Sequence, residues 1–292
     1  MDKYGLIGYP VGHSFSKGFF NDRFKNEGID AEYFNFEIPT IHDLPDVVED
    51  NPDLRGLNVT IPYKEKVLDY LDELTPNAMA IKAVNVIKIV RSKDGKDYKL
   101  IGHNTDVIGF TQSIEGLLKP HHKKALVLGT GGASKAVCHG LEMLGLEHQL
   151  VSRTETEVAI CYEQLTPQLM EEYSVIVNTT PLGMYPNTNK CPAIPYECLT
   201  SQHLLYDLLY NPDTTLFMRK GAAQGATVKN GLEMLLLQAM AAWEIWQEER
   251  PPSIPPRGEV MYSVTIFLSP FGGVGGGDYL TSSHFGGFTP IK

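Results

Sequence analysis

The stretch that decides the fold is KALVLGTGGASKA, residues 124–136. A predicted strand leads into its glycines and a predicted helix follows them, which is the context that a dinucleotide-binding turn requires. Gly129 permits the tight turn, Gly131 lets the backbone approach a pyrophosphate, and the small Ser134 lets helix and sheet pack closely. The start of the helix offers free N–H donors and the positive end of its dipole to the anion. We prefer this interpretation to a glycine-rich turn without a ligand, and the predicted cofactor-binding residues are Gly129, Thr130, Gly131, Gly132 and Ala133.

The next predicted strand, residues 149–152, ends in a feature that bears on the choice of cofactor. Proteins that bind NAD usually place an Asp or Glu about 20 residues beyond the glycines, where it accepts a hydrogen bond from the ribose 2′-hydroxyl. This chain has Ser152, Arg153 and Thr154 there and no carboxylate at the strand end. A guanidinium followed by a hydroxyl suits a 2′-phosphate, so these three residues predict NADP(H).

Outward from this stretch, short apolar runs alternate with helical segments, a pattern typical of a parallel α/β sheet. The predicted strands are residues 4–8, 33–37, 56–60, 84–91, 99–103, 124–129, 149–152, 175–178, 204–208 and 225–228, with a hairpin turn at 93–95. The predicted helices are residues 17–27, 41–50, 105–118, a segment from the glycines to about 144, and 232–246. The fold class is therefore α/β with two domains, the second of the Rossmann type. We expect the last helix to return to the first domain.

Two segments depart from this pattern. Between the strand that ends near Ser152 and the apolar run 158–162 there are too few residues for a crossover helix, since a parallel crossover normally needs a dozen or more. That run is expected either to pair antiparallel at the sheet edge or to form an extended loop. Residues 248–292 hold eight glycines and six prolines, a composition typical of disorder. The predicted division is residues 1–103 with 230–247, residues 104–229, and a tail at 248–292 that is disordered or not native to the body.

Composition narrows the partners and the compartment. The formal charge of −10 and a pI near 5.4 argue against nucleic acid and anionic membranes, which reward clustered Lys and Arg. Four cysteines show no paired metal spacing, so we expect free thiols and no metal site. The most apolar stretch, residues 232–246, is interrupted by Glu233, Gln238 and Glu244, which argues against a membrane span. With no signal peptide, the chain is expected to be cytoplasmic, to act on a small molecule, and to be a monomer or homodimer.

Several polar residues stand where ligands of open α/β sheets bind, beyond the carboxyl ends of strands. In NVTIPYK, residues 58–64, alternation sends Asn58 and Thr60 to one side, and Lys64 enters a turn. Asp106 lies at the entrance to the predicted linking helix. From the residues alone, Lys64 is a solvated lysine and Asp106 a carboxylate favoured by the helix dipole, and nothing pairs them. Ser14 and Ser16 follow the first strand, where they could simply cap the next helix; His13 is given no catalytic role.

Taken together, these motifs resemble the shikimate dehydrogenase family, from residue 1 to about 247. The matching stretches are HSFS at 13–16, NVTIPYK at 58–64, AVN at 83–85, NTDxxGF at 104–110, GTGGASKA at 129–136, NTTPLGM at 178–184, YDLLYNPDTT at 206–215 and NGLEMLLLQA at 230–239. The resemblance implies reversible reduction of 3-dehydroshikimate to shikimate with NADP(H), on a substrate domain and a cofactor domain. The tail has no counterpart in the family.

The resemblance also implies roles for individual residues. Lys64 and Asp106 would be the catalytic pair at the reacting oxygen, with the Lys64 ammonium as donor to the developing alkoxide in ketone reduction. The substrate carboxylate and hydroxyls would be bound by Ser14, Ser16, Asn58, Thr60, Asn85, Tyr210 and Gln238. The nicotinamide would lie near Leu208, Gly231 and Met234.

Two departures from the family keep alternatives open. Lys17 stands where the family has proline, a minor change at a helix start. Glu157 stands where a second cation would hold the 2′-phosphate, which leaves strict NADP preference open. One rival is a quinate/shikimate dehydrogenase that uses NAD; Ser16 argues against it, because the extra hydroxyl of quinate needs room there. The other is a cofactor-binding regulator without turnover, which would need neither Lys64 nor Asp106.

Overall fold

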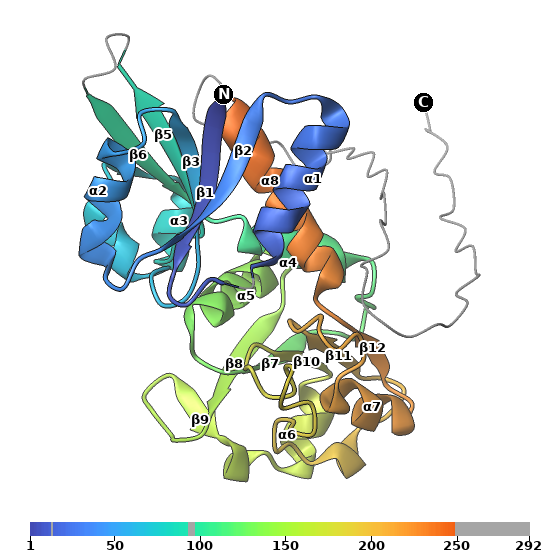
Figure 1. The fold of residues 1–292 in the computed structure, drawn as a ribbon. Coiled ribbons are helices and arrows are strands. Elements are labelled where there is room, and N and C mark those ends of the chain that lie inside the picture. The colour runs from blue at the N-terminus through green and yellow to red at the C-terminus, as the bar shows by residue number, and fades with distance from the viewer. Residues whose placement is uncertain (13, 93–96, 249–292) are drawn as a thin grey trace, which may run out of the picture. The chain divides into compact units, whose positions relative to one another are not determined.

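The structure, a computed structural model, describes residues 1–12, 14–92 and 97–248. These residues form two six-stranded sheets, each with helices on both faces, which confirms the predicted two-domain α/β fold (Figure 1). His13, the predicted turn at 93–95 and the predicted tail, apart from Glu248, lie outside the described residues. None of the helices in the described ranges is long and apolar enough to cross a membrane.

The first sheet has a parallel part and an antiparallel part, in the order β2-β1-β3-β5-β6-β4. β1 pairs in parallel with β2 and β3, and β5 pairs antiparallel with β3 and β6. The strands are β1 (Asp2–Gly8), β2 (Ala31–Glu37), β3 (Leu54–Val59), β4 (Glu73–Leu74), β5 (Val86–Arg91) and β6 (Tyr98–His103). The helices are α1 (Phe15–Glu27), η1 (Ile41–Asp43), α2 (Leu44–Glu49), η2 (Lys66–Tyr70) and α3 (Pro76–Ile81). No sequence pattern predicts β4 or α3, because two and six residues are too few to show a period.

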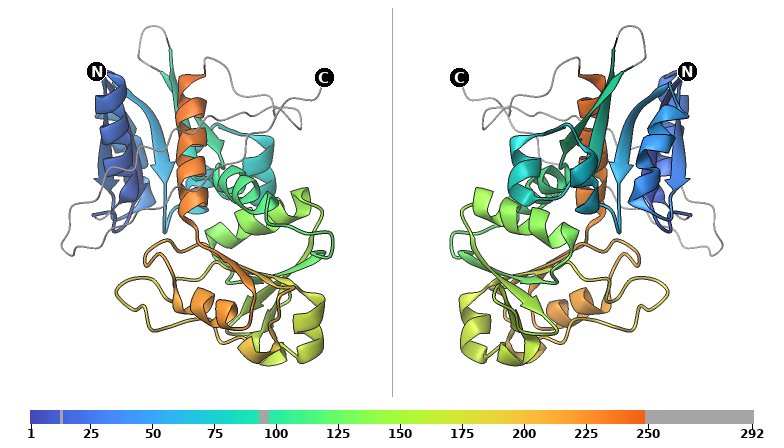
Figure 2. Two further views of the ribbon diagram at one scale, coloured as in Figure 1. Left: turned by 90° about the vertical axis from the view of Figure 1, so that its right-hand side faces the viewer. Right: turned by 90° about the vertical axis from the view of Figure 1, so that its left-hand side faces the viewer.

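The last helix, α8 (Leu232–Gln247), packs on the first sheet together with α1, as predicted (Figure 2). The ring of Tyr4 in β1 stacks on Trp246 with 5.0 Å between centroids, and the Trp246 Nε1 donates to the Ile87 carbonyl at 3.1 Å. A Cβ atom at Gly56 would lie 2.2 Å from that Nε1, so only glycine lets the indole approach β3 this closely. These aromatic contacts therefore hold α8 against β1.

The buried His103 at the end of β6 predicts a loss of stability in acid. Burial, and to a lesser degree the charge of Lys88, lowers the pKa of His103 from 6.5 to about 4. The unfolded chain therefore takes up this proton first as the pH falls, so the contribution of His103 is complete above pH 6.5 and is lost between pH 6.5 and 4. The loss amounts to about 3 kcal/mol in the free energy of unfolding.

Urea unfolding at several pH values between 7 and 4 checks this expectation. His103→Leu should have a flatter dependence of the unfolding free energy on pH than the wild type, because the variant carries no titrating group there. His42→Gln, which changes an exposed histidine away from His103, is the matched control and should keep the wild-type slope. Equal slopes for the wild type and His103→Leu would contradict the assignment.

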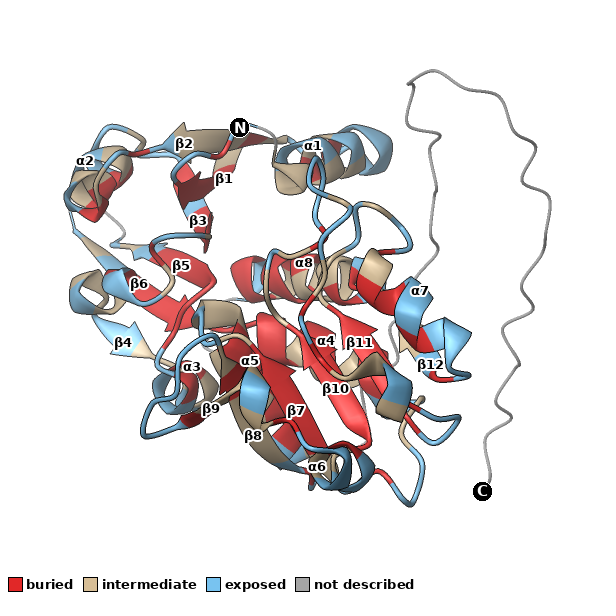
Figure 3. Ribbon diagram, turned by 90° about the horizontal axis from the view of Figure 1, so that it is seen from below, coloured by how far each residue is buried: buried red, intermediate tan, exposed pale blue. Residues whose placement is uncertain are grey.

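The second sheet is parallel throughout, in the order β12-β11-β10-β7-β8-β9. Its central strands are buried on both faces, as Figure 3 shows for β7, β10 and β11. The strands are β7 (Lys124–Leu128), β8 (Glu147–Ser152), β9 (Ala159–Cys161), β10 (Val175–Asn178), β11 (Leu204–Asp207) and β12 (Thr227–Lys229). One face is covered by α4 (Asp106–Glu115) and α5 (Gly132–Met143), the other by α6 (Pro167–Glu172) and α7 (Leu216–Ala223). Two 3₁₀ turns, η3 (Tyr162–Gln164) and η4 (Tyr196–Cys198), complete it.

The structure corrects the prediction for the apolar run at 158–162. Its central residues form β9, which pairs with β8 in parallel, with Leu150 opposite Ala159 and Ser152 opposite Cys161. Both expected alternatives, an antiparallel strand and an extended loop, are therefore wrong. A long crossover is needed to return along a whole strand, but β9 has only three residues and the chain returns by two strand positions, roughly 7 Å. The six residues 153–158 are long enough for that, without a helix.

Candidate active site

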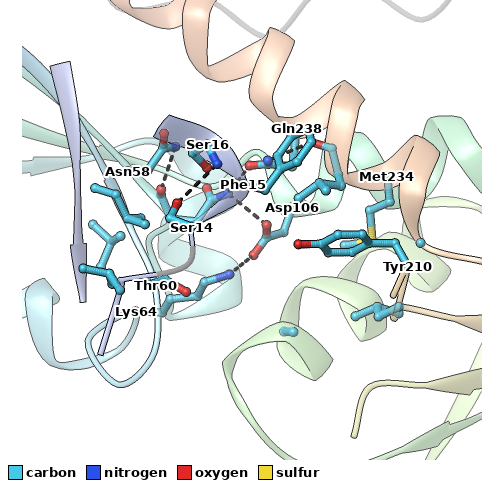
Figure 4. A pocket seen from close by; sticks show the side chains of 18 of the residues that line it. Ser14, Phe15, Ser16, Asn58, Thr60, Lys64, Asp106, Tyr210, Met234 and Gln238 are labelled. Atoms are coloured by element: carbon cyan, nitrogen blue, oxygen red, sulfur yellow. Dashed lines mark hydrogen bonds and ion pairs between the residues drawn. The ribbon is translucent and has the colours of Figure 1, made fainter. Parts of the chain in front are cut away.

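A cavity of about 750 Å³ collects most of the residues predicted for substrate and catalysis (Figure 4). It is lined by the carboxyl ends of β1, β3 and β11, by the starts of α1, α4 and α5, and by the first half of α8. The predicted residues that line it are Ser14, Ser16, Asn58, Thr60, Lys64, Asn85, Asp106, Ala133, Leu208, Tyr210, Gly231, Met234 and Gln238. Residues from opposite ends of the described chain thus share one site, and no local pattern could have shown this.

Lys64 and Asp106 form an ion pair at the centre of this cavity. The Lys64 Nζ lies 2.5 Å from the Asp106 Oδ2, and the two side chains are only 18% and 8% exposed. β3 ends at Val59 and Lys64 lies in the turn that follows, while Asp106 is the first residue of α4. The structure thus brings together two residues that the sequence pattern alone left unpaired.

Asn85 fixes the orientation of the Asp106 carboxylate. Its Nδ2 donates to the Asp106 Oδ1 at 2.9 Å, so one carboxylate oxygen faces Asn85 and the other faces Lys64. The Asn85 Oδ1 in turn accepts from the Thr105 backbone N–H at 2.7 Å, which holds the amide in place. The same Nδ2 lies 3.4 Å from the Gln238 Oε1 of α8. Asn85 therefore connects the ion pair to the returning helix.

The polar residues that the first domain contributes to the cavity are held in place by hydrogen bonds to neighbouring groups. Ser14 caps α1, since its Oγ accepts from the Ser16 N–H at 3.2 Å, so the capping role considered for this turn is real even though both serines also line the cavity. The Asn58 Oδ1 accepts from the Tyr33 hydroxyl at 2.7 Å. Tyr33 is fully buried, and burial raises the pKa of its hydroxyl, which keeps it a donor. These bonds leave the cavity with a fixed set of small polar groups.

The glycine turn stands at the switch point of the second sheet, where β7 lies between β8 and β10. Gly129 has a φ of 112°, and a Cβ atom there would lie 2.7 Å from the Thr179 Oγ1, so both conformation and space require glycine. An added Cβ at Gly131 would meet nothing within 4 Å, which leaves the backbone at the start of α5 open to a ligand. Gly131 also offers no side chain to cap the helix, so its first N–H groups suit a pyrophosphate.

The glycine turn and residues 152–154, which were predicted to bind the phosphates of the cofactor, lie mostly outside the cavity. Only Ala133 of the glycine turn reaches the cavity itself. Ser152, Arg153 and Thr154 lie outside it at the end of β8, beside the glycine turn, because the Gly129 N–H donates to the Val151 carbonyl at 2.8 Å. Arg153 is exposed there. The arrangement therefore puts the uncapped start of α5 and an exposed cation beside each other at the carboxyl ends of β7 and β8.

A buried network that the sequence analysis missed shapes the far wall of the cavity. Asp207 is fully buried at the end of β11 and accepts from the Asn178 Nδ2, the Thr215 hydroxyl and the Leu209 N–H at 3.0, 2.6 and 3.1 Å. Burial raises the pKa of Asp207 and its three donors lower it. Burial is the larger effect, so the resulting pKa is about 6. Leu208 and Tyr210, which line the cavity, flank this anchored stretch. The signal was present in YDLLYNPDTT, where a carboxylate directly follows an apolar run.

Comparisons with known proteins show which family the chain is similar to. Residues 6–87 match the family model described as the shikimate dehydrogenase substrate binding domain. Shikimate dehydrogenase (NADP(+)) of Carboxydothermus hydrogenoformans is 38% identical over 265 residues, covering 85% of this chain and 92% of the relative. The corresponding enzyme of Caldicellulosiruptor saccharolyticus is 35% identical over 264 residues, with 84% and 92% covered.

Solved structures agree as well. Shikimate 5-dehydrogenase from Thermus thermophilus, in complex with NADP(H) and shikimate, is similar with a TM-score of 0.73 at 30% identity, covering 86% of this chain and 95% of that one. Shikimate dehydrogenase from Aquifex aeolicus has a TM-score of 0.73 at 33% identity, with 85% and 92% covered. Because both sequence and structure match over nearly the full length of these relatives, the chain belongs to the shikimate dehydrogenase family.

Proposed function

We propose that this protein catalyses the reversible, NADP(H)-dependent reduction of 3-dehydroshikimate to shikimate. The observation that carries the proposal is the part-buried Lys64–Asp106 ion pair, which lines the cavity together with the start of α5. Relatives that are similar over most of the chain are named as NADP-dependent shikimate dehydrogenases. One solved relative holds both NADP(H) and shikimate.

In this proposal Lys64 handles the proton while bound NADPH supplies the hydride. As the carbonyl carbon is reduced, negative charge develops on its oxygen, and the Lys64 ammonium donates a proton to it. Asp106 holds the ammonium and would also accept a hydrogen bond from the substrate hydroxyl. Asn85 fixes the orientation of the Asp106 carboxylate for both roles. The Asp106 carboxylate, whose Oδ2 lies 2.5 Å from the Lys64 Nζ, holds the ammonium in position as a donor.

The substrate is proposed to lie against the polar wall of the cavity. Its carboxylate and hydroxyls would be bound by Ser14, Ser16, Asn58, Thr60, Asn85, Tyr210 and Gln238, all of which line the cavity. The nicotinamide would lie against Leu208, Gly231 and Met234, which line the same cavity. This places the reacting carbon between the hydride donor and the ion pair.

The adenosine 2′-phosphate is proposed to bind Ser152, Arg153 and Thr154. Arg153→Ala should raise KM for NADP⁺ by about tenfold or more, because it removes a charge-assisted hydrogen bond, and should hardly change KM for NAD⁺. Arg219→Ala, on the exposed surface of α7, is the matched control and should change neither value. Steady-state kinetics with both cofactors provide the measurement, and an equal loss with NADP⁺ and NAD⁺ would refute the phosphate role.

One kinetic experiment tests the function as a whole. Shikimate and quinate are each assayed with NADP⁺ and with NAD⁺, and shikimate with NADP⁺ is expected to give the highest kcat/KM. Preference for quinate with NAD⁺ would favour the quinate/shikimate alternative. Turnover in none of the four combinations would leave only the cofactor-binding regulator.

We propose that residues 1–103 with 230–247 bind the substrate and residues 104–229 bind the cofactor, supported by the separate cores of the two sheets. The assignment of the tail, the cytoplasmic location and the choice between monomer and homodimer stay predictions from composition and resemblance.

A further inference from the structure

The start of α5 contacts the loop that carries Lys64. The Glu65 Oε2 lies 2.7 Å from the Lys135 Nζ, which joins the residue after Lys64 to the helix that follows the glycine turn. A Cβ atom added at Gly132 would lie 3.5 Å from the Lys64 Cβ and 3.7 Å from its Cδ, so the first turn of α5 lies beside the lysine's methylenes, with room for one methyl group between them. The start of α5 and Lys64 are therefore close neighbours, and the direct contact between the two segments is the Glu65–Lys135 ion pair.

An apolar cluster supports this contact from beneath. Ala136 of α5 packs with Ile81, Ala83 and Val107, which belong to the first sheet's side and to the linking helix α4. The backbone of Lys64 is tied to the same segment, because its carbonyl accepts from the Val84 N–H at 2.7 Å. Residues 132, 135 and 136 lie on one face of α5, so this face is committed to the Lys64 loop.

We propose that Glu65 and Lys135 form a clasp that positions Lys64 against the cofactor-binding end of α5. The inference rests on the proposed function. Lys64 needs a position relative to both the substrate oxygen and the nicotinamide, which are held by different sheets. The clasp ties the lysine's loop to the helix whose first turn would hold the pyrophosphate. Glu65 and Lys135 are therefore positioning residues that act through Lys64.

The clasp predicts a specific pattern among three variants. Glu65→Gln and Lys135→Gln should each lower kcat for shikimate oxidation by about three- to fivefold, the most that a half-exposed ion pair supports, with smaller changes in KM. The charge swap Glu65→Lys with Lys135→Glu should restore most of the lost kcat, because the pair re-forms in reverse. Glu172→Gln is the matched control: it breaks the similarly exposed pair of Glu172 with Lys124 at the opposite end of β7, and should leave kcat unchanged.

Hydrogen exchange gives a readout that does not depend on turnover. In the ligand-free protein, amides in the second turn of α5, where the helical hydrogen bonds begin, should exchange faster in Glu65→Gln than in the wild type, and Glu172→Gln should behave as the wild type. Unchanged exchange and unchanged kcat in Glu65→Gln would overturn the clasp. So would an effect of Lys135→Gln on KM for NADP⁺ alone, since Lys135 would then bind phosphate directly. A wild type without shikimate turnover would instead sink the proposed function itself.

Discussion

Lys64→Ala is expected to lower kcat for shikimate oxidation by about 10³-fold, within the range of lost general acid–base catalysis. The ammonium pairs with Asp106 at 2.5 Å, and removing it would leave the reacting oxygen without its proton carrier and Asp106 without a counter-charge. KM should change only a few-fold, because the polar wall that binds the substrate is intact. Steady-state kinetics with saturating NADP⁺ provide the measurement.

The neighbouring Lys66 offers the control for this variant. Lys66 is exposed at the start of η2 and has no place in the proposed site, so Lys66→Ala should retain the wild-type kcat. If Lys64→Ala raised KM and left kcat intact, Lys64 would be a binding residue only. Circular dichroism of both variants establishes that each is folded.

Gly231→Ala should nearly abolish activity through space alone. The φ of Gly231 is −83°, which any residue adopts, but an added Cβ would lie 2.1 Å from the Leu208 carbonyl oxygen and 2.5 Å from its carbon. These are backbone atoms of the stretch anchored by Asp207, so they cannot turn aside as a flexible side chain would. We expect a loss of about 1–3 kcal/mol in stability from overpacking. The nicotinamide wall should shift as well, and kcat/KM should fall by about 100-fold.

Gly116→Ala is the matched control, since an added Cβ there meets nothing within 4 Å and the backbone is helical. It should be neutral or slightly stabilising, because alanine restricts the unfolded chain. Thermal unfolding and kcat/KM measured on both variants separate the two cases. A Gly231→Ala enzyme with wild-type kcat/KM would show that Leu208 can move freely.

The fold was largely predictable because its strands carry strong local signals. The three aliphatic residues of 175–178 predict a strand with the bounds that β10 has. The structure buries all four residues of that strand. At β1 the prediction began at residue 4, because Asp2 and Lys3 are polar residues whose pairing with β2 no local pattern shows. The run at 158–162 failed for a different reason: the length rule for crossovers assumes strands longer than the three residues of β9.

The site was predictable only in part. The glycine turn and Arg153 follow from residue chemistry at a strand end, which is local information. Lys64 and Asp106 are 42 residues apart, and their contact depends on how β3 and α4 are placed, so only the family resemblance paired them. Asp207 was missed because its burial arises from contacts with Asn178 and Thr215 on other segments.

The return of α8 has a consequence for folding during synthesis. The aromatic face of the first sheet, with Tyr4, Phe20, Phe24 and Tyr33, is covered by Trp243 and Trp246 from the far end of the described chain. A ribosome completes the whole second sheet before it adds these tryptophans, although domains generally fold in the order of their synthesis. The strands of the first sheet are therefore synthesised first, but their aromatic face is covered only after α8 has been synthesised. That face stays uncovered for most of translation.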